Sequence, residues 1–296
     1  MTDPNEWTDA VAGTPEDRPV PTGEPTAADV AGYVPHAPDP DALLEVDDVT
    51  LRFGGVVALD AVSFSLRRGE IFGLIGPNGA GKTTCFNAMT GVYRPTIGEI
   101  RFNGQVITGK KKHQITHMGI ARTFQNIRLF PEMTAIENVM VGADAHHKTS
   151  VLGALFRVPR FWREERDGHR KALELLDFVG IGGRGNVVAR NLAYGEQRRL
   201  EIARALATNP TLLCLDEPAA GFNPIEKDSL LDLIRRIRDI GVTILLIEHD
   251  MRLVMNVCER IVVLEFGKKI AEGVPAEVRE NPRVINAYLG VPADAA

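Results

Sequence analysis

Residues 70–84 read Glu-Ile-Phe-Gly-Leu-Ile-Gly-Pro-Asn-Gly-Ala-Gly-Lys-Thr-Thr, and this stretch decides the fold. From Glu70 to Gly76 it is a near-continuous apolar run of strand length, which is typical of a strand buried on both faces of a parallel sheet. Residues 76–83 have the spacing G-x-x-x-x-G-K-T, after that strand and before a helical stretch. The sequence therefore predicts a loop that binds phosphate groups.

The residue types in this loop suit phosphate binding. Glycines let backbone N–H groups surround phosphate oxygens, and the N-terminus of the following helix favours anions. We expect Lys82 to reach the β- and γ-phosphates of a nucleoside triphosphate and Thr83 to ligate Mg²⁺. The alternative is a glycine-rich turn that matches by chance, and the flanking strand and helix argue against it. The candidate nucleotide-binding residues of the loop are Gly76, Pro77, Asn78, Gly79, Ala80, Gly81, Lys82, Thr83 and Thr84.

Two carboxylates follow a second buried-type strand. Leu212–Leu215 is apolar, and Asp216 and Glu217 come directly after it. An acid at the carboxyl end of a parallel strand faces the ligand crevice beside the phosphate loop. We therefore expect Asp216 to hold Mg²⁺ through water and Glu217 to deprotonate an attacking water as general base. A solvated strand end is the alternative, and the phosphate loop upstream favours the functional interpretation.

Gln125, His249 and residues 192–196 are functional candidates only because the chain also contains the phosphate loop. Gln125 follows Ala121-Arg-Thr-Phe, and His249 follows the apolar run that starts at Thr243. A single Gln or His is more often structural than functional. Leu192-Ala-Tyr-Gly-Glu196 precedes a predicted helix and, taken by itself, is an ordinary helix entry.

The order of the other elements indicates an α/β fold. Alternating apolar positions over 43–66 predict strands, and Asn103-Gly104 and Phe266-Gly267 predict hairpin turns. The strand–helix–strand order over 212–247 argues for a parallel sheet with a right-handed crossover. A helical insertion is predicted over 135–182, and helices are predicted at 163–179, 196–209, 226–240 and 275–289.

The charge is unevenly distributed. The whole chain has a formal charge of -5, but residues 1–40 hold eight acids, one base and eight of the 18 prolines. A segment so acidic and so poor in large apolar side chains buries too little surface to offset the entropy of ordering it. We therefore predict a disordered, acidic, Pro-rich tail over residues 1–40. A solubilising or unselected extension is the main interpretation of this tail, and a regulatory or docking role is the alternative.

The composition narrows the class of protein. Three widely spaced cysteines, Cys85, Cys214 and Cys258, match neither a disulfide framework nor a zinc site, which favours a reducing compartment. No apolar run approaches the roughly 20 residues needed to cross a bilayer. Residues 41–296 have a net charge of +2 without a long basic stripe, so we expect no nucleic-acid partner.

The motifs together resemble the ATP-binding subunits of ABC transporters. The finer features resemble the branched-chain amino-acid (leucine/isoleucine/valine) importer ATPases over about residues 43–290. The shared order of motifs is the phosphate loop, Gln125, Leu-Ala-Tyr-Gly-Glu-Gln-Arg-Arg-Leu-Glu-Ile-Ala-Arg-Ala-Leu at 192–206, Asp216-Glu217-Pro218 and Glu248-His249-Asp250. The finer features are Phe53-Gly54-Gly55, residues 122–130, residues 219–224, Leu-Phe-Arg…Pro-Arg-Phe at 155–161, and the ending from Asn281 to Gly290.

The resemblance implies a fold: α/β, a P-loop NTPase ABC cassette in which a mixed sheet core carries N-terminal antiparallel strands and a helical subdomain. It implies an ABC ATPase domain over residues 41–296, with the helical subdomain over about 131–208 and a C-terminal helix over about 275–290. An apolar patch inside the insertion, Val151–Phe156 with Phe161 and Trp162, is our candidate for the surface that docks a membrane partner. Packing of the insertion against itself is the alternative.

The resemblance also implies residue roles, with ATP and Mg²⁺ as ligands. Phe53 would stack on adenine, Gln125 would contact Mg²⁺ and respond to the membrane partner, and His249 would contact the γ-phosphate. Ala193, Tyr194, Gly195 and Glu196 would form a signature that closes over ATP bound to the opposite subunit, near Asn223 of the dimer-contact loop. The implied catalytic residues are Lys82, Glu217 and His249, and the implied metal ligands are Thr83, Gln125 and Asp216.

Several positions depart from the usual pattern of such ATPases. Ala193, Tyr194 and Glu196 stand where most have Ser, Gly and Gln, and the loss of the Ser hydroxyl removes one donor to the γ-phosphate. Asn223 stands in place of Asp, which keeps the hydrogen bonding but not the charge. Phe53 replaces Tyr and keeps the stacking face.

The implied function is an ATP-hydrolysing subunit that dimerises around two ATP and drives an importer for branched-chain amino acids, at the cytoplasmic face of the cell membrane. Its expected partners are integral-membrane permease subunits, a second ABC ATPase subunit and a separate solute-binding protein. The alternatives are the ATPase of a lipopolysaccharide-extraction exporter or a urea importer, or a soluble non-transport ABC ATPase. For the second ATPase subunit the resemblance implies a homologous heterodimer partner, with a homodimer as the alternative.

Overall fold

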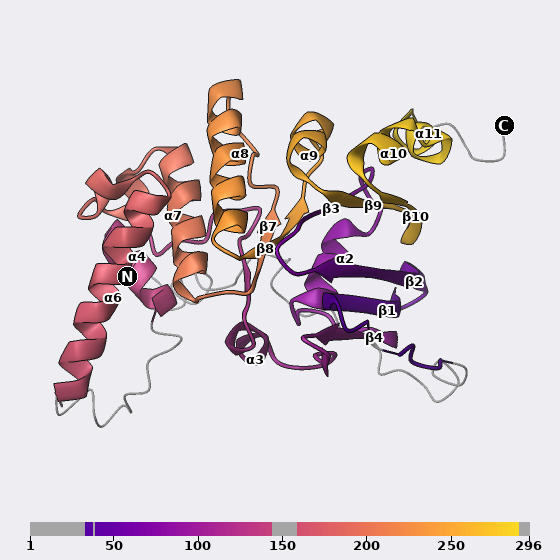
Figure 1. Cartoon of the computed structure of the whole chain (residues 1–296), viewed down its shortest axis with the longest axis horizontal. Helices are drawn as coiled ribbons and strands as arrows, with labels where there is room; N and C mark the ends of the chain where they lie inside the picture. Colours follow the sequence, from indigo (N-terminus) through magenta and orange to yellow (C-terminus); the bar gives the residue numbers. More distant parts are fainter. Residues whose placement is uncertain (1–32, 38, 144–158, 290–296) are drawn as a thin grey trace, which may run out of the picture.

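The structure is a computed structural model that describes residues 33–37, 39–143 and 159–289 (Figure 1). Its described strands form two sheets. The first is an antiparallel sheet in the order β2-β1-β4-β5. Its strands are β1 (Ala42–Phe53), β2 (Val56–Arg67), β4 (Ile97–Phe102) and β5 (Gln105–Val106). The predicted N-terminal antiparallel strands are therefore confirmed.

The second sheet forms the centre of the molecule, in the order β10-β9-β3-β8-β7-β6. Strands β6, β7, β8, β3 and β9 are parallel, and only the edge strand β10 is antiparallel, which confirms the predicted mixed sheet. The bounds are β3 (Ile71–Ile75), β6 (Ile120–Arg122), β7 (Leu212–Asp216), β8 (Thr243–Ile247), β9 (Arg260–Glu265) and β10 (Lys268–Gly273).

The near-continuous apolar runs are explained by burial on both faces of this central sheet. Successive side chains of a strand point to opposite faces. Ile71 and Ile75 of β3 accordingly pack into the core on the helical side, whereas Phe72 and Leu74 pack into the core shared with the antiparallel sheet. Both faces of β3 are therefore dry, and the strand that leads into the phosphate loop is held rigidly.

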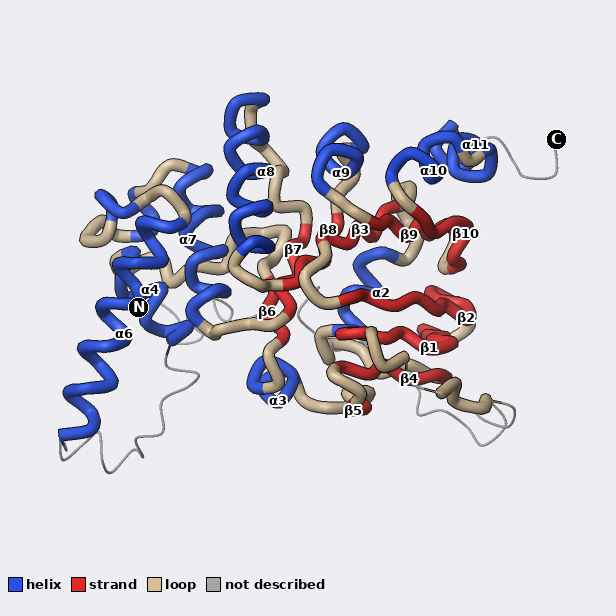
Figure 2. The backbone as a smooth tube through the Cα atoms, in the orientation of Figure 1, coloured by secondary structure: helices blue, strands red, loops and turns tan. Residues whose placement is uncertain are grey.

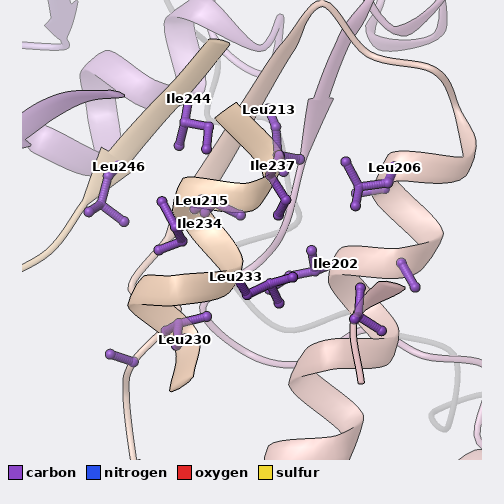
Figure 3. Packing of buried hydrophobic residues seen from close by; sticks show 14 of the residues in the cluster. Ile202, Leu206, Leu213, Leu215, Leu230, Leu233, Ile234, Ile237, Ile244 and Leu246 are labelled. Carbon is purple, nitrogen blue, oxygen red and sulfur yellow. The ribbon is translucent and has the colours of Figure 1, made fainter. Parts of the chain in front are cut away.

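Helices cover one face of the central sheet, and α2 with the antiparallel sheet covers the other (Figures 1 and 2). Figure 3 shows α7 and α8 packing Ile202, Leu206, Leu233 and Ile237 against Leu213 and Leu215 of β7 and Ile244 and Leu246 of β8. The helices are α2 (Lys82–Met89), α3 (Lys112–His117), α4 (Ala135–Ala143), α6 (Pro159–Phe178), α7 (Tyr194–Ala207), α8 (Pro224–Asp239), α9 (Met251–Val257), α10 (Pro275–Glu280) and α11 (Pro282–Leu289), with short 3-10 turns η4 (Gly182–Arg184) and η5 (Ala189–Asn191).

Helices α4, α6 and α7 pack on one another at one end of the molecule (Figure 1). Gly142 lets α4 approach α7 closely, because a Cβ atom there would lie 2.2 Å from the carbonyl oxygen of Arg204. The helical subdomain expected over 131–208 stays a prediction as a domain boundary. Residues 151–156 of the predicted docking patch, and the side chains of Phe161 and Trp162, lie outside what the structure describes.

The C-terminal helix expected over about 275–290 is divided into two helices. Asn281 separates α10 from α11 with extended backbone, φ -72° and ψ 118°. Pro282 is the cause, because its ring disfavours helical geometry in the preceding residue and it has no N–H to continue the ladder. The Asn281 side chain then accepts a hydrogen bond from the N–H of Arg283 at 2.9 Å.

Residues before β1 lie against the antiparallel sheet at Asp47. The Tyr33 hydroxyl and the His36 N–H donate to Oδ2 of Asp47 at 2.8 and 3.0 Å, and Nδ1 of His36 lies 2.5 Å from Oδ1. The disordered tail is predicted over residues 1–40. Residues 1–32 and 38 lie outside the described residues, so their disorder stays a prediction, whereas Tyr33 and His36 of the same segment form hydrogen bonds with the sheet. Among the described residues no helix is both long and apolar enough to cross a membrane.

Candidate nucleotide-binding site

The phosphate loop joins β3 to α2 through positions that only glycine fits. Gly76 has φ of 151°, and a Cβ atom there would lie 2.1 Å from the carbonyl oxygen of Leu264 on β9. Gly81 has φ of 96° directly before α2, and its Cβ atom would lie 2.8 Å from the carbonyl oxygen of Ala58 on β2. Glycine is therefore required at both ends of the loop by the neighbouring strands.

Lys82 is buried and turns back along the loop. Its Nζ donates to the carbonyl oxygens of Gly76 at 2.8 Å and Pro77 at 3.0 Å. Burial lowers the pKa of Lys82, and the charges of Glu217 and Asp216 oppose that change. The first N–H groups of α2 have no acceptor within their own helix. A cation beside such donors fits a phosphate ligand.

The remaining loop residues differ in exposure. Ala80 is buried and donates its N–H to the carbonyl oxygen of Pro77 at 3.1 Å. Asn78, Gly79 and Thr83 are exposed, and Thr84 is half-buried. The crest of the loop is therefore open to a ligand, while its base is fixed.

Asp216 and Glu217 stand at the carboxyl end of β7. The Asp216 side chain is buried, and Oδ2 lies 3.8 Å from Nη2 of Arg122. Glu217 has φ of 45° and donates its N–H to the carbonyl oxygen of Ile247, at the end of β8, at 2.9 Å. Strand β8 pairs in parallel with both β3 and β7. The two carboxylates after β7 and the phosphate loop after β3 therefore lie at the same, carboxyl ends of the strands.

The Glu217 carboxylate lies close to Gln125, which follows β6 in the sequence, and to His249, which follows β8. Nε2 of Gln125 donates to Oε2 of Glu217 at 3.0 Å. Nδ1 of His249 lies 3.6 Å from the same oxygen. Three loops thus converge on one carboxylate, and the side chains of Gln125 and His249 can orient a group next to it.

Two cavities adjoin the phosphate loop. One, of about 430 Å³, is lined by Gly79–Thr84 together with Val56–Ala58 and Phe266-Gly267. The second is a groove of about 840 Å³ that extends from α2 and β6 to α4 and α7. Thr83 lines both cavities, so the loop lies at their junction.

The three predicted metal ligands line the same groove. Thr83, Gln125 and Asp216 offer a hydroxyl, an amide oxygen and a carboxylate there. Oxygen donors of these types are those that Mg²⁺ prefers, usually with only one or two protein carboxylates alongside substrate phosphates. The donor set therefore fits a magnesium ion that accompanies a nucleotide.

Phe53 lines neither cavity, although it contacts Tyr93, which lines the larger groove. Phe53 ends β1, and its ring packs edge-on against Tyr93 with the ring centroids 5.1 Å apart. The large apolar side chains that line the smaller cavity are instead those of Val56, Val57 and Phe266. The stacking role of Phe53 stays a prediction, and these three apolar residues were missed by the sequence reasoning.

A family model described as "ABC transporter" matches residues 59–220, which include the phosphate loop, Gln125, the 192–196 segment and Glu217. The chain belongs to the ABC transporter family. A second model, described as "Branched-chain amino acid ATP-binding cassette transporter", matches residues 268–294 of this ABC cassette. The cassette is accordingly a P-loop ATPase that binds nucleotide.

Curated relatives cover the ABC cassette almost from end to end. It is 50% identical over 249 residues to the high-affinity branched-chain amino acid transport ATP-binding protein BraF of Pseudomonas aeruginosa, covering 84% of this chain and 98% of that protein. The corresponding protein LivG of Escherichia coli (strain K12) is 49% identical over the same shares.

Solved structures agree with this assignment. The ADP conformation of an ATP-binding cassette of an ABC transporter is 34% identical, with a TM-score of 0.74, covering 84% of this chain and 99% of that one. A dimeric post-hydrolysis state of another ATP-binding cassette, bound to ADP and Pi, is 25% identical with a TM-score of 0.67, covering 78% of this chain and 98% of that one.

The signature segment of the ABC cassette lies at the N-terminus of α7, and its residues line neither cavity beside the phosphate loop. Ala193 precedes the helix without a capping oxygen, and its N–H donates instead to Oε2 of Glu196 at 3.1 Å. Glu196 is also paired with Arg184 at 2.7 Å, and this bond lowers its pKa. Tyr194 packs over Gly221, and Gly195 lies in the first helical turn.

Asn223 caps the N-terminus of α8 in the ABC cassette. Its Oδ1 accepts a hydrogen bond from the N–H of Glu226 at 3.0 Å, and its own N–H donates to Oε2 of Glu226 at 2.8 Å. This reciprocal pair caps α8. The side chain is therefore engaged within its own chain, and its predicted role in nucleotide binding stays a prediction.

Sequence reasoning missed the buried polar residues that position the site. Arg122 stacks on Phe86 and Phe124 and donates to Asn87 at 3.0 Å. Glu248, between the last residue of β8 and His249, is buried and accepts a hydrogen bond from the N–H of Ala219. The sequence did contain a signal for them: each is a charged residue next to apolar residues, and a charged side chain that is buried requires a partner.

Proposed function

We propose that this chain is the ATP-hydrolysing subunit of an importer for branched-chain amino acids. The convergence of Gln125 and His249 on Glu217, beside the phosphate loop, carries the proposal. The names of the relatives and the match at residues 268–294 support the substrate class.

Glu217 is the proposed general base. Its carboxylate would accept the proton of the attacking water, while Gln125 and His249 hold that oxygen in position. Lys82 and the first turn of α2 would bind the phosphates. Thr83, Gln125 and Asp216 would hold Mg²⁺, which would neutralise phosphate charge.

Two further subunit types fit the arrangement. The signature at α7 is separate from the cavities of its own phosphate loop, so it would serve ATP on a second cassette, as a dimeric relative's structure suggests. Permease subunits at the cytoplasmic face of the membrane would use the 840 Å³ groove, because it is lined by Gln125 and by apolar and cationic side chains. A separate solute-binding protein would deliver the amino acid.

The test uses the full chain, tagged and purified from membranes together with whatever permease and ATPase subunits accompany it. Glu217→Gln should leave ATP affinity unchanged and lower ATP turnover and leucine uptake by about 10²–10⁴-fold. Glu280→Gln, an exposed carboxylate on α10, is the control and should match the wild type. Full turnover in the Glu217 variant would refute the catalytic assignment, and unchanged leucine uptake in cells lacking the chain would refute the substrate.

A further inference from the structure

Phe266 is an unusual residue for the turn in which it lies. It is the first central residue of the β9–β10 hairpin, with φ of 46°, and Gly267 follows with φ of 77°. Positive φ at both central positions defines a type I′ turn, which favours Asn, Asp or Gly. The Phe266 side chain is also 83% exposed, so its ring gains little from burial.

The same molecule contains a matched turn without this anomaly. Asn103 and Gly104 join β4 to β5 with φ of 52° and 71°. The two turns therefore share positive φ at both central positions, and the expected Asn occupies the first central position in one of them. Neither turn geometry nor packing explains an aromatic residue at 266.

The location of the Phe266 turn supplies the explanation. Gly267 donates its N–H to the carbonyl oxygen of Ala80 at 3.0 Å and accepts from the N–H of Asp60 at 2.9 Å. The approach is close, because a Cβ atom on Gly267 would lie 2.6 Å from the carbonyl oxygen of Ala58. The turn is thus fixed directly on the phosphate loop.

The exposed ring stands at one side of the 430 Å³ cavity. Phe266, Val56 and Val57 line it together, and the two valines are 67% and 44% exposed. Gly79–Thr84 of the phosphate loop line the same cavity. An apolar wall next to a phosphate cradle matches a ligand that is flat and apolar at one end and anionic at the other.

We infer that Phe266 is a nucleotide-binding residue whose ring contacts the base or ribose of the nucleotide held by the phosphate loop. The inference rests on the proposed nucleotide site and adds a contact to it. Aromatic rings gain about 0.5–1.5 kcal/mol from such contacts beyond area burial, equivalent to a two- to tenfold change in affinity. The exposed ring is thereby covered only when nucleotide is bound.

The experiment measures the binding of ATP and of inorganic tripolyphosphate to the full chain by calorimetry. Phe266→Asn, which suits the turn, should weaken ATP binding about two- to tenfold and leave tripolyphosphate binding unchanged. Its melting temperature should equal or exceed that of the wild type. Phe266→Trp should retain wild-type ATP affinity, because it keeps the aromatic face.

Asn103→Phe is the matched control, because it places the same ring in the same turn type away from the cavity. It should lower the melting temperature and leave ATP affinity unchanged. Equal ATP affinity in Phe266→Asn and the wild type, or equal losses for ATP and tripolyphosphate, would overturn the inference. A Lys82→Ala variant that still binds both ligands at wild-type affinity would instead overturn the nucleotide site itself.

Discussion

Glu217 adopts a backbone conformation that few residues other than glycine tolerate, with φ of 45°. Such strain costs about 1–3 kcal/mol and persists only when surrounding contacts enforce it. Glu248, 1% exposed, supplies such contacts: Oε1 accepts from the N–H of Ala219 at 2.9 Å and Oε2 from the N–H of His249 at 3.3 Å. The Glu248 carboxylate therefore joins the loop of Glu217, the proposed general base, to the loop of His249.

Glu248→Gln should lower ATP turnover about tenfold and leave ATP affinity unchanged. A glutamine side chain offers one oxygen where two backbone N–H groups need acceptors, so one of the two loops would shift. Steady-state kinetics together with equilibrium binding of ATP would measure both quantities.

Glu70→Gln is the control for general destabilisation, because Glu70 is a buried carboxylate that accepts from Arg67 and Arg260 at the other end of β3. It should lower the melting temperature without changing turnover per folded molecule. Equal turnover losses in the two variants would show that Glu248 acts only on stability.

At the scale of elements, α7 is joined to the segment that carries Gln125. Arg198, 2% exposed, donates to the carbonyl oxygens of Phe124, at 2.6 Å, and Gln125. Glu201 accepts from the N–H of Phe124 at 3.2 Å and pairs with Arg198 at 3.3 Å. The same helix begins at the predicted signature, so Arg198 and Glu201 link the signature to the segment that carries Gln125.

Removing one partner of this buried pair should be costly. Arg198→Leu should lower the free energy of unfolding by about 3–5 kcal/mol, because it removes the cation paired with the buried Glu201 carboxylate and leaves that carboxylate with the N–H groups of Phe124 and Arg128. Denaturant titration would measure the change. Arg170→Leu, which removes an exposed ion pair with Asp167 on α6, should cost about 1 kcal/mol or less. Similar losses in both variants would contradict the importance of the α7 contact.

At the scale of the whole molecule, the segment before β1 is joined to β1 through two carboxylates: Asp47, which bonds Tyr33 and His36, and Glu45, which accepts from the N–H of Asp39 at 2.6 Å. Burial by itself would raise the pKa of Asp47, but hydrogen bonds from Tyr33 and His36 outweigh it and hold that pKa below its usual value. A depressed pKa means that ionised Asp47 stabilises the fold. That contribution is complete above the unfolded value, about 3.9, and is lost as the pH falls through the folded value.

Asp47→Asn should therefore lower the melting temperature at pH 7, and its difference from the wild type should shrink below about pH 4. Calorimetric scans between pH 3 and pH 7 would follow the difference. Asp48→Asn is the neighbouring control: it sits at φ of 53°, which Asn tolerates, and should show little change. A difference for Asp47→Asn that does not depend on pH would contradict the ionised contact.

Patterns among residues that are close in sequence predicted many of the strands, the phosphate loop and two of the turns. The spacing at 76–83, the period-two runs and the two positive-φ turns each depend on neighbours in sequence, and the structure has them where expected. The break at Asn281 was readable from Pro282 but was missed. The contact of Phe53 with Tyr93 and the approach of Glu248 to Ala219 join residues far apart in the chain, and only tertiary packing determines them.

The position of β3 has a consequence for synthesis. This strand pairs only with β8 and β9 in the described sheet, so residues 71–75 acquire their neighbours from residues 243–265. At about 5–20 residues per second, a ribosome needs on the order of ten to thirty seconds to cover that interval. Throughout it the nascent chain carries an unpaired apolar strand directly before the phosphate loop. A chain that stops before residue 243 should therefore be a substrate for chaperones and proteases.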